Sequence, residues 1–360
     1  MKSLKDLMSS FKAATGASGA VGIDVGSSSI KVVELQEKND VLTLSTYGEL
    51  QLGPYEGKDL GESVQLDQKA EQEALVDVIR ESAVTVRNAV FAMPLSSSFV
   101  TNVSIEADAD EDLSPMVRVE ARKVIPASLS EVTLDWAEVE RPKNDSSDAN
   151  RRDVLIAAIQ NVALERFQVL MQFAGFPKPP TEIECFSAIR GLYNSKNPDT
   201  VIIDIGATST KLYIARDALL MRMHRVRAGG TVATQQIAKA LEVDFAEAEQ
   251  MKQSADKTSE SFADLKRAHD ESYERAFREF NQVLREYESK TGHEIDVVHL
   301  TGGGALFPGM EAMLKESLNK DIEFANPFSK VAYPAFMDDT IKKIGPSFVV
   351  ALGAALRDFE

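Results

Sequence analysis

The chain has 360 residues, of which 44% are hydrophobic and 27% charged, so it is long enough to form two domains with packed cores. Its 40 basic and 56 acidic side chains give a formal net charge of −16, which argues against nonspecific binding to nucleic acid and broad adhesion to an anionic membrane. One cysteine and four histidines exclude an internal disulfide and a Cys/His zinc cluster, and no apolar run is long enough to cross a bilayer, so we expect a cytoplasmic protein.

Residues 1–20 stand apart from the rest of the chain. Their apolar side chains recur at helical spacing, at Leu4, Leu7, Met8 and Phe11, which predicts a short amphipathic helix followed by a linker of small residues. Such a helix suits a membrane surface or a partner, or it docks on its own domain as a frayed terminal helix. The sequence leaves these alternatives open.

The next stretch, residues 21–31, predicts a β-hairpin. A short apolar run, broken by Asp24, leads into a turn and then into a second apolar run. A turn of glycine and serine presents backbone N–H groups and hydroxyls that suit phosphate oxygens, and an aspartate at the strand end suits a magnesium ion held through water. Such turns are common, so this hairpin alone does not separate a phosphate site from an ordinary turn. The turn residues are Gly26, Ser27, Ser28 and Ser29.

The same pattern occurs a second time at residues 201–211, 180 positions after the first copy. Self-similarity at half the chain length predicts two related lobes, each with this hairpin at its centre. Two such hairpins facing each other would clamp a di- or triphosphate. The residues coincide without a gap in the pairs Asp24/Asp204, Gly26/Gly206, Ser29/Ser209 and Lys31/Lys211.

Between the two hairpins, the pattern predicts the rest of the first lobe and an inserted subdomain. A strand at 41–50, a helix at 68–83 and a strand ending at 93 complete a β-β-β-α-β half of an α/β layer fold. Residues 95–175 form a small α+β unit without a convergent polar cluster, so we expect it to contact a partner. Its expected elements are strands at 99–105, 132–139 and 153–159, helices at 113–124 and 161–173, and a loop at 141–152.

Glu184 lies where a strand over 181–184 meets a helix that begins near Cys185. A carboxylate at this junction suits the ordering of an attacking water over a γ-phosphate. The alternative is an acid at a helix N-terminus that the helix dipole stabilises. Both interpretations stay open.

After the second hairpin and its third strand, the pattern is mainly helical. The Gly229-Gly230 pair allows close approach of the backbone to a ligand or to a neighbouring helix, and a helix follows at 234–241. Residues 245–290 are predicted to be nearly continuous helix, whose apolar stripe packs a helical subdomain. The chain ends in a Gly- and Ala-rich helix, expected at 346–357 and suited to close packing.

Two further features suit an adenosine. Glu249 and Lys252 lie three residues apart on one helix face, where they suit hydrogen bonds to a ribose and an adenine, although a simple ion pair is the alternative. A later strand runs into three consecutive glycines, which let the backbone lie flat against a purine. No Lys-Ser/Thr pair follows, so this is not a P-loop. The glycines are Gly302, Gly303 and Gly304.

Two Asp-x-Gly hairpins followed by a late triple-glycine turn resemble the actin-like ATPase superfamily, over nearly the whole chain after residue 20. The resemblance implies an α/β, actin-like two-lobe ATPase fold. Its duplicated β-β-β-α-β-α core would carry the small α+β insertion in lobe one and a helical insertion in lobe two. Within the superfamily, the chain resembles the PilM family of type IV pilus assembly proteins in its strings at 22–31, 229–234, 248–252, 325–328 and 351–357.

The resemblance also implies ATP and Mg²⁺ as ligands, and it leaves open whether ATP is turned over. Asp24 and Asp204 would hold the magnesium ion through water, and Glu184 would orient the attacking water. The phosphates would contact Gly26, Ser27, Ser28, Ser29, Lys31, Gly206, Ala207, Thr208 and Ser209. The adenosine would contact Gly229, Gly230, Glu249, Lys252, Gly302, Gly303, Gly304 and Phe307.

On this pattern the chain divides into consecutive parts. They are an N-terminal segment at 1–20, the lobe-one core at 21–94 and 176–198, the insertion at 95–175, the lobe-two core at 199–232 and 293–340, a helical subdomain at 233–292, and a C-terminal helix at 341–360 that packs on lobe one.

The resemblance implies a partner, the short cytoplasmic N-terminus of the inner-membrane protein PilN, in a groove beside residues 95–175. The protein would be a cytoplasmic scaffold of twitching motility, peripheral at the inner membrane through that partner. One alternative is an FtsA-like cell-division protein, which would end in a membrane-binding helix not expected here. Others are a GspL-like type II secretion component, which would continue into a transmembrane segment, and a small-molecule kinase, which would need an aspartate general base in a substrate pocket of lobe one.

Overall fold

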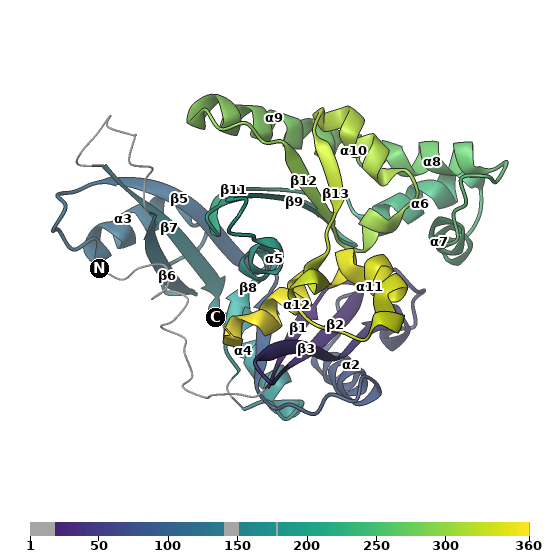
Figure 1. The fold of residues 1–360 in the computed structure, drawn as a ribbon, viewed down its shortest axis with the longest axis horizontal. Coiled ribbons are helices and arrows are strands. Elements are labelled where there is room, and N and C mark those ends of the chain that lie inside the picture. The colour runs from purple at the N-terminus through teal and green to yellow at the C-terminus, as the bar shows by residue number, and fades with distance from the viewer. Residues whose placement is uncertain (1–18, 140–150, 178, 360) are drawn as a thin grey trace.

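The computed structural model describes residues 19–139, 151–177 and 179–359 and shows two lobes with a smaller subdomain at one side (Figure 1). One lobe holds the purple N-terminal strands together with the yellow C-terminal helices, and the other holds the green segments. The predicted N-terminal helix and most of the loop predicted at 141–152 lie outside the described residues.

Lobe one is a five-stranded sheet with helices on both faces. In order across the sheet, the strands are β3 (Val41–Gln51), β2 (Ser29–Lys38), β1 (Gly19–Val25), β4 (Ala89–Met93) and β8 (Thr181–Ile183). The helices α2 (Gln68–Glu81) and α4 (Asn161–Phe173) cover one face, and α5 (Glu184–Leu192) and α12 (Val349–Leu356) cover the other. Because both faces are covered, β1 and β4 are apolar and buried along nearly their whole length.

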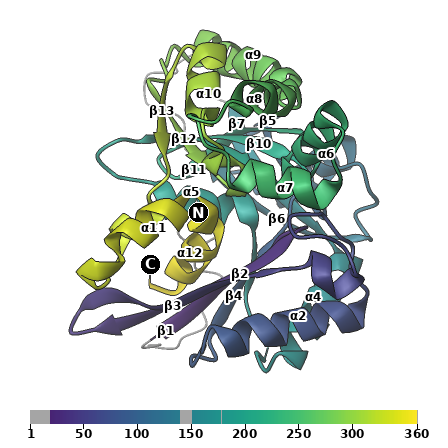
Figure 2. The same cartoon turned by 90° about the vertical axis from the view of Figure 1, so that its right-hand side faces the viewer.

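Lobe two has a second five-stranded sheet of the same design. Its strands are β11 (Leu219–Val226), β10 (Thr210–Arg216), β9 (Asp199–Ile205), β12 (Val297–Thr301) and β13 (Asp321–Phe324). The helices α6 (Gly230–Leu241), α9 (Glu274–Thr291) and α10 (Met310–Leu318) bury its outer face. The inner face packs on α5 and α12, which therefore lie between the two sheets (Figure 2).

The predicted duplication is confirmed strand by strand. In each lobe the first strand is antiparallel to the second and parallel to the fourth. Even an irregularity is repeated, because the second strand shifts register against the third after Glu34 in lobe one and after Ile214 in lobe two, again 180 residues apart. Such β-bulges are specific features of a fold, so both lobes are copies of one unit.

A three-stranded antiparallel sheet forms most of the insertion, in the order β5 (Ser98–Glu106), β7 (Arg151–Gln160), β6 (Val132–Val139). Together with α3 (Ser114–Val124) it encloses a core of its own, as expected for a separate unit. The predicted range 95–175 also held α4, but that helix buries Phe167, Leu170 and Met171 in the lobe-one core. We call residues 98–160 the inserted subdomain.

Two helix predictions in lobe two were wrong in their bounds. The helix expected to run nearly unbroken over 245–290 is divided into α7 (Phe245–Gln253), α8 (Phe262–Glu271) and α9. The first break contains Asp256, whose carboxylate accepts the Thr258 N–H at 2.9 Å and so stabilises a local turn that competes with helix. The helix expected from residue 234 begins at Gly230, because the carbonyls of Gly206 and Ala207 accept the backbone N–H groups of Gly230 and Thr231.

The C-terminal helix is held by backbone contacts on both sides. A short helix α11 (Asp338–Ile344) and a 3₁₀ turn (Gly345–Phe348) precede α12, so the regular helix is shorter than the predicted 346–357. A Cβ added to Gly22 of β1 would lie 1.8 Å from the Ala351 carbonyl oxygen, and one added to Gly353 would lie 1.8 Å from the Ser187 carbonyl oxygen. The expected close packing of this helix is therefore confirmed, because only hydrogen fits at these contacts.

Candidate functional site

A cavity of about 1210 Å³ lies between the lobes. The ends of β1 and β9, the turns that follow them, α7 and the triple glycine contribute to its walls. The two halves of the pattern repeated in the sequence therefore face a single space. The cavity is large enough for a nucleotide, because small-molecule sites in proteins typically have a volume of about 300–1,000 Å³.

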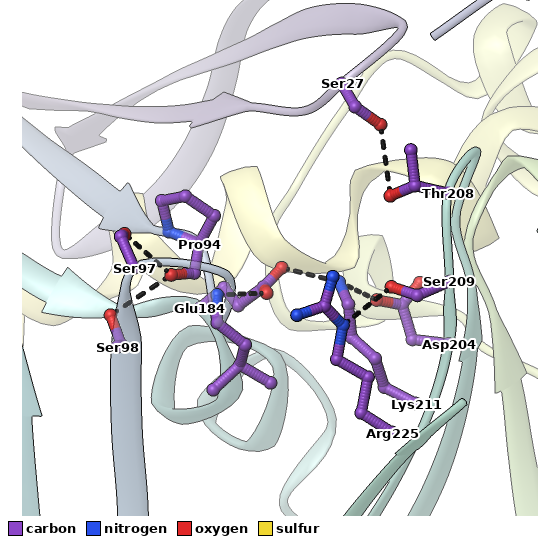
Figure 3. A network of polar contacts seen from close by, with 11 residues as sticks. Ser27, Pro94, Ser97, Ser98, Glu184, Asp204, Thr208, Ser209, Lys211 and Arg225 are labelled. Atoms are coloured by element: carbon purple, nitrogen blue, oxygen red, sulfur yellow. Dashed lines mark hydrogen bonds and ion pairs between the residues drawn. The ribbon is translucent and has the colours of Figure 1, made fainter. Parts of the chain in front are cut away.

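The two hairpin turns have the same geometry and meet across the cavity. Gly26 N–H donates to the Ser29 carbonyl at 2.9 Å, and Gly206 N–H donates to the Ser209 carbonyl at 3.0 Å. The Ser27 hydroxyl donates to the Thr208 hydroxyl at 3.4 Å, so the turns touch at their tips (Figure 3). Ser28 and Ala207 line the same space.

The serine at the end of each turn also accepts a hydrogen bond from a positively charged side chain. The Ser29 hydroxyl accepts from Lys31 Nζ at 2.7 Å, and the Ser209 hydroxyl accepts from Arg225 Nε at 3.1 Å. Both serines are buried, so their hydroxyls position these cations. Arg225, near the end of β11, lines the cavity and was not among the predicted site residues, because its position two strands beyond the turn gives no local signal.

Lys211 is a second residue that the predicted site lacks. Its Nζ lies 2.7 Å from Glu184 Oε2 and 3.0 Å from Asp204 Oδ2 (Figure 3), and all three residues line the cavity. Burial lowers the pKa of Lys211, but Asp204 and Glu184 outweigh burial and hold the pKa above its usual range. A signal was present in the sequence, because Lys211 coincides with the predicted phosphate ligand Lys31 in the repeat.

Asp24 faces the same cluster from lobe one. Burial raises its pKa to about 6, with nearby Lys31 and Lys211 opposing and Glu184 and Asp204 reinforcing the rise. Asp24, Asp204 and Glu184 therefore interact electrostatically near the two turns, although within the described residues they are not placed to ligate a metal ion together. Carboxylates that orient waters around a cation suit Mg²⁺, which keeps several waters when it binds.

We expect replacement of Asp24 by asparagine to stabilise the ligand-free protein at pH 8. A carboxyl whose folded-state pKa is raised contributes stability below its unfolded value, and this contribution is lost as pH rises through about 6. After a discount for partial solvent access, the gain at pH 8 should be about 1–2 kcal/mol. Urea unfolding of both proteins at pH 5 and pH 8 measures it. A gain that does not grow with pH would contradict the raised pKa.

Glu184, the predicted water-orienting acid, is buried and has both carboxylate oxygens engaged. Oε1 accepts the Leu95 backbone N–H at 2.7 Å, and Oε2 accepts from Lys211. The residue also begins α5, so the helix-dipole interpretation describes its position as well.

At the other end of the cavity, Glu249 and Lys252 form the ion pair that was the alternative interpretation, with 2.6 Å between Glu249 Oε2 and Lys252 Nζ. The Thr234 hydroxyl donates to Glu249 Oε2 at 2.5 Å and accepts from Lys252 Nζ at 2.6 Å. Burial lowers the pKa of Lys252, and the negative charge of Glu249 offsets part of this decrease. Both residues line the cavity and remain placed to reach a ligand.

The three glycines of the late turn differ in the reason why each position needs glycine. Gly302 has φ +89° and its Cβ would lie 2.4 Å from the Ile205 carbonyl oxygen, and a Cβ on Gly304 would lie 2.3 Å from Ile205 Cγ2. Both are therefore explained by packing against the end of β9. Gly303 has nothing within 4 Å of its Cβ position and borders the cavity, so it alone leaves space for a ligand.

Two other predicted adenosine contacts are mainly packed against protein. Phe307 is buried and stacks on His269 with 3.6 Å between ring centroids, although it borders the cavity. A Cβ on Gly229 would lie 2.5 Å from the Ala207 carbonyl oxygen, and Gly229 is not among the residues that line the cavity. Gly230 borders the cavity, and its N–H donates to the Gly206 carbonyl at 2.9 Å. The glycine pair thus docks the start of α6 on the second turn.

The duplicated sheets, the facing turns and the cleft between them define an actin-like ATPase fold. A family model for the type IV pilus assembly protein PilM matches residues 22–359, so the chain belongs to the PilM family. This membership favours the pilus interpretation of the sequence over the cell-division and secretion alternatives.

Solved structures show the same fold. A PilM–PilN type IV pilus biogenesis complex is similar with a TM-score of 0.79 at 24% identity, covering 95% of this chain and 98% of that chain. The ethanolamine utilization protein EutJ from Carboxydothermus hydrogenoformans gives 0.54 at 16%, covering 95% and 90%. MreB5 of Spiroplasma citri bound to AMPPNP gives 0.52 at 13%, covering 91% and 98%. No helix in the described part of the chain is long and apolar enough to cross a membrane.

Proposed function

We propose that this PilM-family protein binds Mg·ATP in the cleft and uses the bound nucleotide to set the angle between its lobes during type IV pilus assembly. The observation that carries the proposal is the pair of equivalent turns, which meet at 3.4 Å between Ser27 and Thr208 from opposite lobes. A triphosphate between them would contact both lobes at once. A ligand that contacts both lobes favours one lobe angle over others, by its differential affinity for the two arrangements.

Each end of the cleft has a role in this proposal. Backbone N–H groups of the turns, together with Lys31 and Lys211, would bind phosphate oxygens. Glu249 and Lys252 would contact the ribose and base, and Gly303 would leave space beside the base. The similar MreB5 structure contains AMPPNP, which supports a nucleotide in a cleft of this fold.

Magnesium would be bound by phosphate oxygens and waters, with Asp24 and Asp204 as outer partners. Within the described ranges, no group of three His, Cys, Asp or Glu side chains is placed to hold a metal ion directly. A water-mediated site agrees with the usual preference of Mg²⁺ for retaining several waters. When bound, the ion would neutralise phosphate charge, and the carboxylates of this chain would orient its waters.

The proposed partner is the cytoplasmic N-terminal peptide of a PilN-like inner-membrane protein, bound between lobe one and the inserted subdomain. The similar solved structure is a PilM–PilN complex, which supports this choice of partner. Such binding would place this protein on the cytoplasmic side of the inner membrane.

Calorimetric titration tests both parts of the proposal. We expect the protein to bind a nonhydrolysable ATP analogue with Mg²⁺, and to bind a synthetic PilN N-terminal peptide with and without the nucleotide. A scrambled peptide of the same composition is the control, since it keeps the charge but not the order of side chains. No heat with the analogue would remove the nucleotide claim, and no heat with the peptide in either state would remove the partner claim.

A further inference from the structure

The inserted subdomain is attached to both lobes, although the chain connects it to lobe one alone. The chain enters the subdomain from β4 and leaves it into α4, and both of these elements belong to lobe one. Non-covalent contacts join it to lobe two at its base and along its edge.

At its base, the turn at 94–97 that leads into the subdomain is joined to lobe two through Glu184, the first residue of α5 in lobe one. Oε1 of this residue holds the N–H of Leu95, in the turn that leads from β4 into β5, at 2.7 Å. Oε2 accepts from Lys211 of lobe two at 2.7 Å, so one carboxylate bridges the turn and the other lobe (Figure 3).

The turn that receives this bond is itself well braced. The Pro94 carbonyl accepts from the Ser97 hydroxyl at 3.0 Å and from the Ser98 hydroxyl at 3.1 Å. Its backbone is closed by the Ser97 N–H bond to Pro94 at 3.1 Å. A displacement of the Leu95 N–H is therefore passed to the start of β5 and not absorbed by a loose loop.

Along its edge, the subdomain is joined to lobe two through Asn102 of β5. The Asn102 side-chain amide donates to the Leu220 carbonyl at 2.9 Å and to the Met221 carbonyl at 2.8 Å. Met221 is the bulged residue of β11, without a partner opposite it on β10. The bulge thus presents two carbonyls to one amide group of the inserted subdomain.

Apolar packing supports the same attachment. Val100 and Leu155 of the inserted subdomain lie in one buried cluster with Tyr213 and Leu220 of lobe two. In contrast, the opposite face of the three-stranded sheet packs mainly on α3 within the subdomain. The same cluster contains Ile189 and Val349 of lobe one, so the inner face of the subdomain packs against both lobes.

We propose that Glu184 and Asn102 are positioning residues that make the inserted subdomain follow lobe two when a nucleotide changes the lobe angle. This inference rests on the proposed function and names the residues through which the nucleotide would act on the partner site. A triphosphate near Lys211 draws that ammonium toward itself and changes the pull on Glu184, and so on the turn at Leu95. The subdomain then turns against lobe one, which changes the space between them where the partner peptide is proposed to bind.

Spin-label distances test the proposal directly. Val119 on α3 is 50% exposed and the Lys69 side chain on α2 is 84% exposed, so V119C and K69C report the separation of the inserted subdomain from lobe one. The single native cysteine, Cys185, is buried and is not expected to take up label. We expect the distance distribution to shift when a nonhydrolysable ATP analogue with Mg²⁺ is added.

The labelled protein is then compared with variants of the two positioning residues. E184Q keeps an acceptor for the Leu95 N–H but loses the ion pair with Lys211, and N102A loses both bonds to β11. Each should reduce the nucleotide-induced shift to less than half, and the double variant should abolish it. Nucleotide occupancy is measured separately by calorimetry, so that every shift is compared at saturation.

Two matched controls should keep the full shift. E71Q changes another buried carboxylate that borders the cavity, but its ion pair, to Arg166 at 2.8 Å, lies within lobe one. S104A changes a polar residue two positions after Asn102 on β5, whose hydroxyl bonds Asp153 at 2.5 Å within the inserted subdomain. If the shift depended simply on any charge in the cleft or on any polar group on β5, these two controls would reduce it as well.

A full shift in E184Q or in N102A would overturn the proposal, as would a loss of the shift in either control. Bound nucleotide without a shift in the parent protein would also overturn it and would leave the nucleotide claim intact. Absence of nucleotide binding in the parent protein would instead remove the proposed function, and this inference with it. Should E184Q fail to bind nucleotide, N102A and S104A decide the question, because neither residue borders the cavity.

Discussion

Replacing Gly303 by valine is expected to weaken the binding of ATP by more than about 100-fold, or about 2.7 kcal/mol, while the unfolding midpoint stays at its original value. The reason is the open space at this position, since no atom of the protein beyond the neighbouring residues in the chain lies within 4 Å of a Cβ placed there. The valine side chain would extend into the cavity and would occupy the space proposed for the adenosine. Calorimetric titration with Mg·ATP analogue and urea unfolding measure the two effects.

The neighbouring glycines show why this position is informative. Substitution of Gly302 or Gly304 would damage the fold, because each Cβ would collide with Ile205, and a loss of binding would then have two explanations. G303A provides a graded control, since a methyl group occupies less of the cavity and should weaken binding less than valine does. Unchanged affinity in G303V would show that the nucleotide, if bound, lies elsewhere.

The second large effect is expected in the stability of the folded protein. Replacing Gly353 by alanine should lower the free energy of unfolding by about 3 kcal/mol, because the methyl group would lie 1.8 Å from the Ser187 carbonyl oxygen and force α12 away from α5. Helix propensity predicts the opposite sign, since alanine in a helix interior is favoured over glycine by about 1 kcal/mol. Urea unfolding distinguishes the two.

G303A is a suitable comparison for this measurement as well, because its methyl group meets open space and should leave stability nearly unchanged. A loss of 3 kcal/mol is large against the total stability of a domain, which is about 5–15 kcal/mol, so a lower yield of folded protein is also expected for G353A. Equal or greater stability of G353A would mean that α12 is free to move away from α5 at little cost.

Much of the fold follows from local patterns in the chain. The hairpins at 21–31 and 201–211 were predicted from short apolar runs around a Gly-Ser or Gly-Ala-Thr turn, and both lie where expected. Their repeat predicted two related lobes, and the matched strand orders and the matched register shifts confirm this. Sequence patterns work here because a strand covered on both faces is a short continuous apolar run, which is visible within a few residues.

Helix bounds and subdomain limits were less predictable. The start of α6 depends on the carbonyls of the turn at 206–207, which lie more than twenty residues earlier in the chain. The assignment of α4 to the lobe-one core depends on which surface its apolar face meets. Neither partner is visible within the helix itself, since an amphipathic pattern predicts a buried face but not what covers it.

In the candidate site as well, local patterns were predicted and long-range contacts were not. The predicted phosphate and adenosine residues, apart from Gly229, border a single cavity, whereas the partners of Glu184 were not predicted at all. Its interactions join residues that are 89 and 27 positions away in the chain. Contacts at such separations are set by the packing of whole lobes.

By itself, then, the sequence determined the repeated strand-turn-strand units, the two-lobe architecture and the resemblance to the PilM family, because periodicity and turn chemistry are local properties. The tertiary structure decided which of three adjacent glycines is left for a ligand, and that Lys211 pairs with Glu184. It also decided that Asn102 binds the bulge of β11. These features depend on distances between segments that are far apart in the chain, and such distances exist only once the lobes have packed.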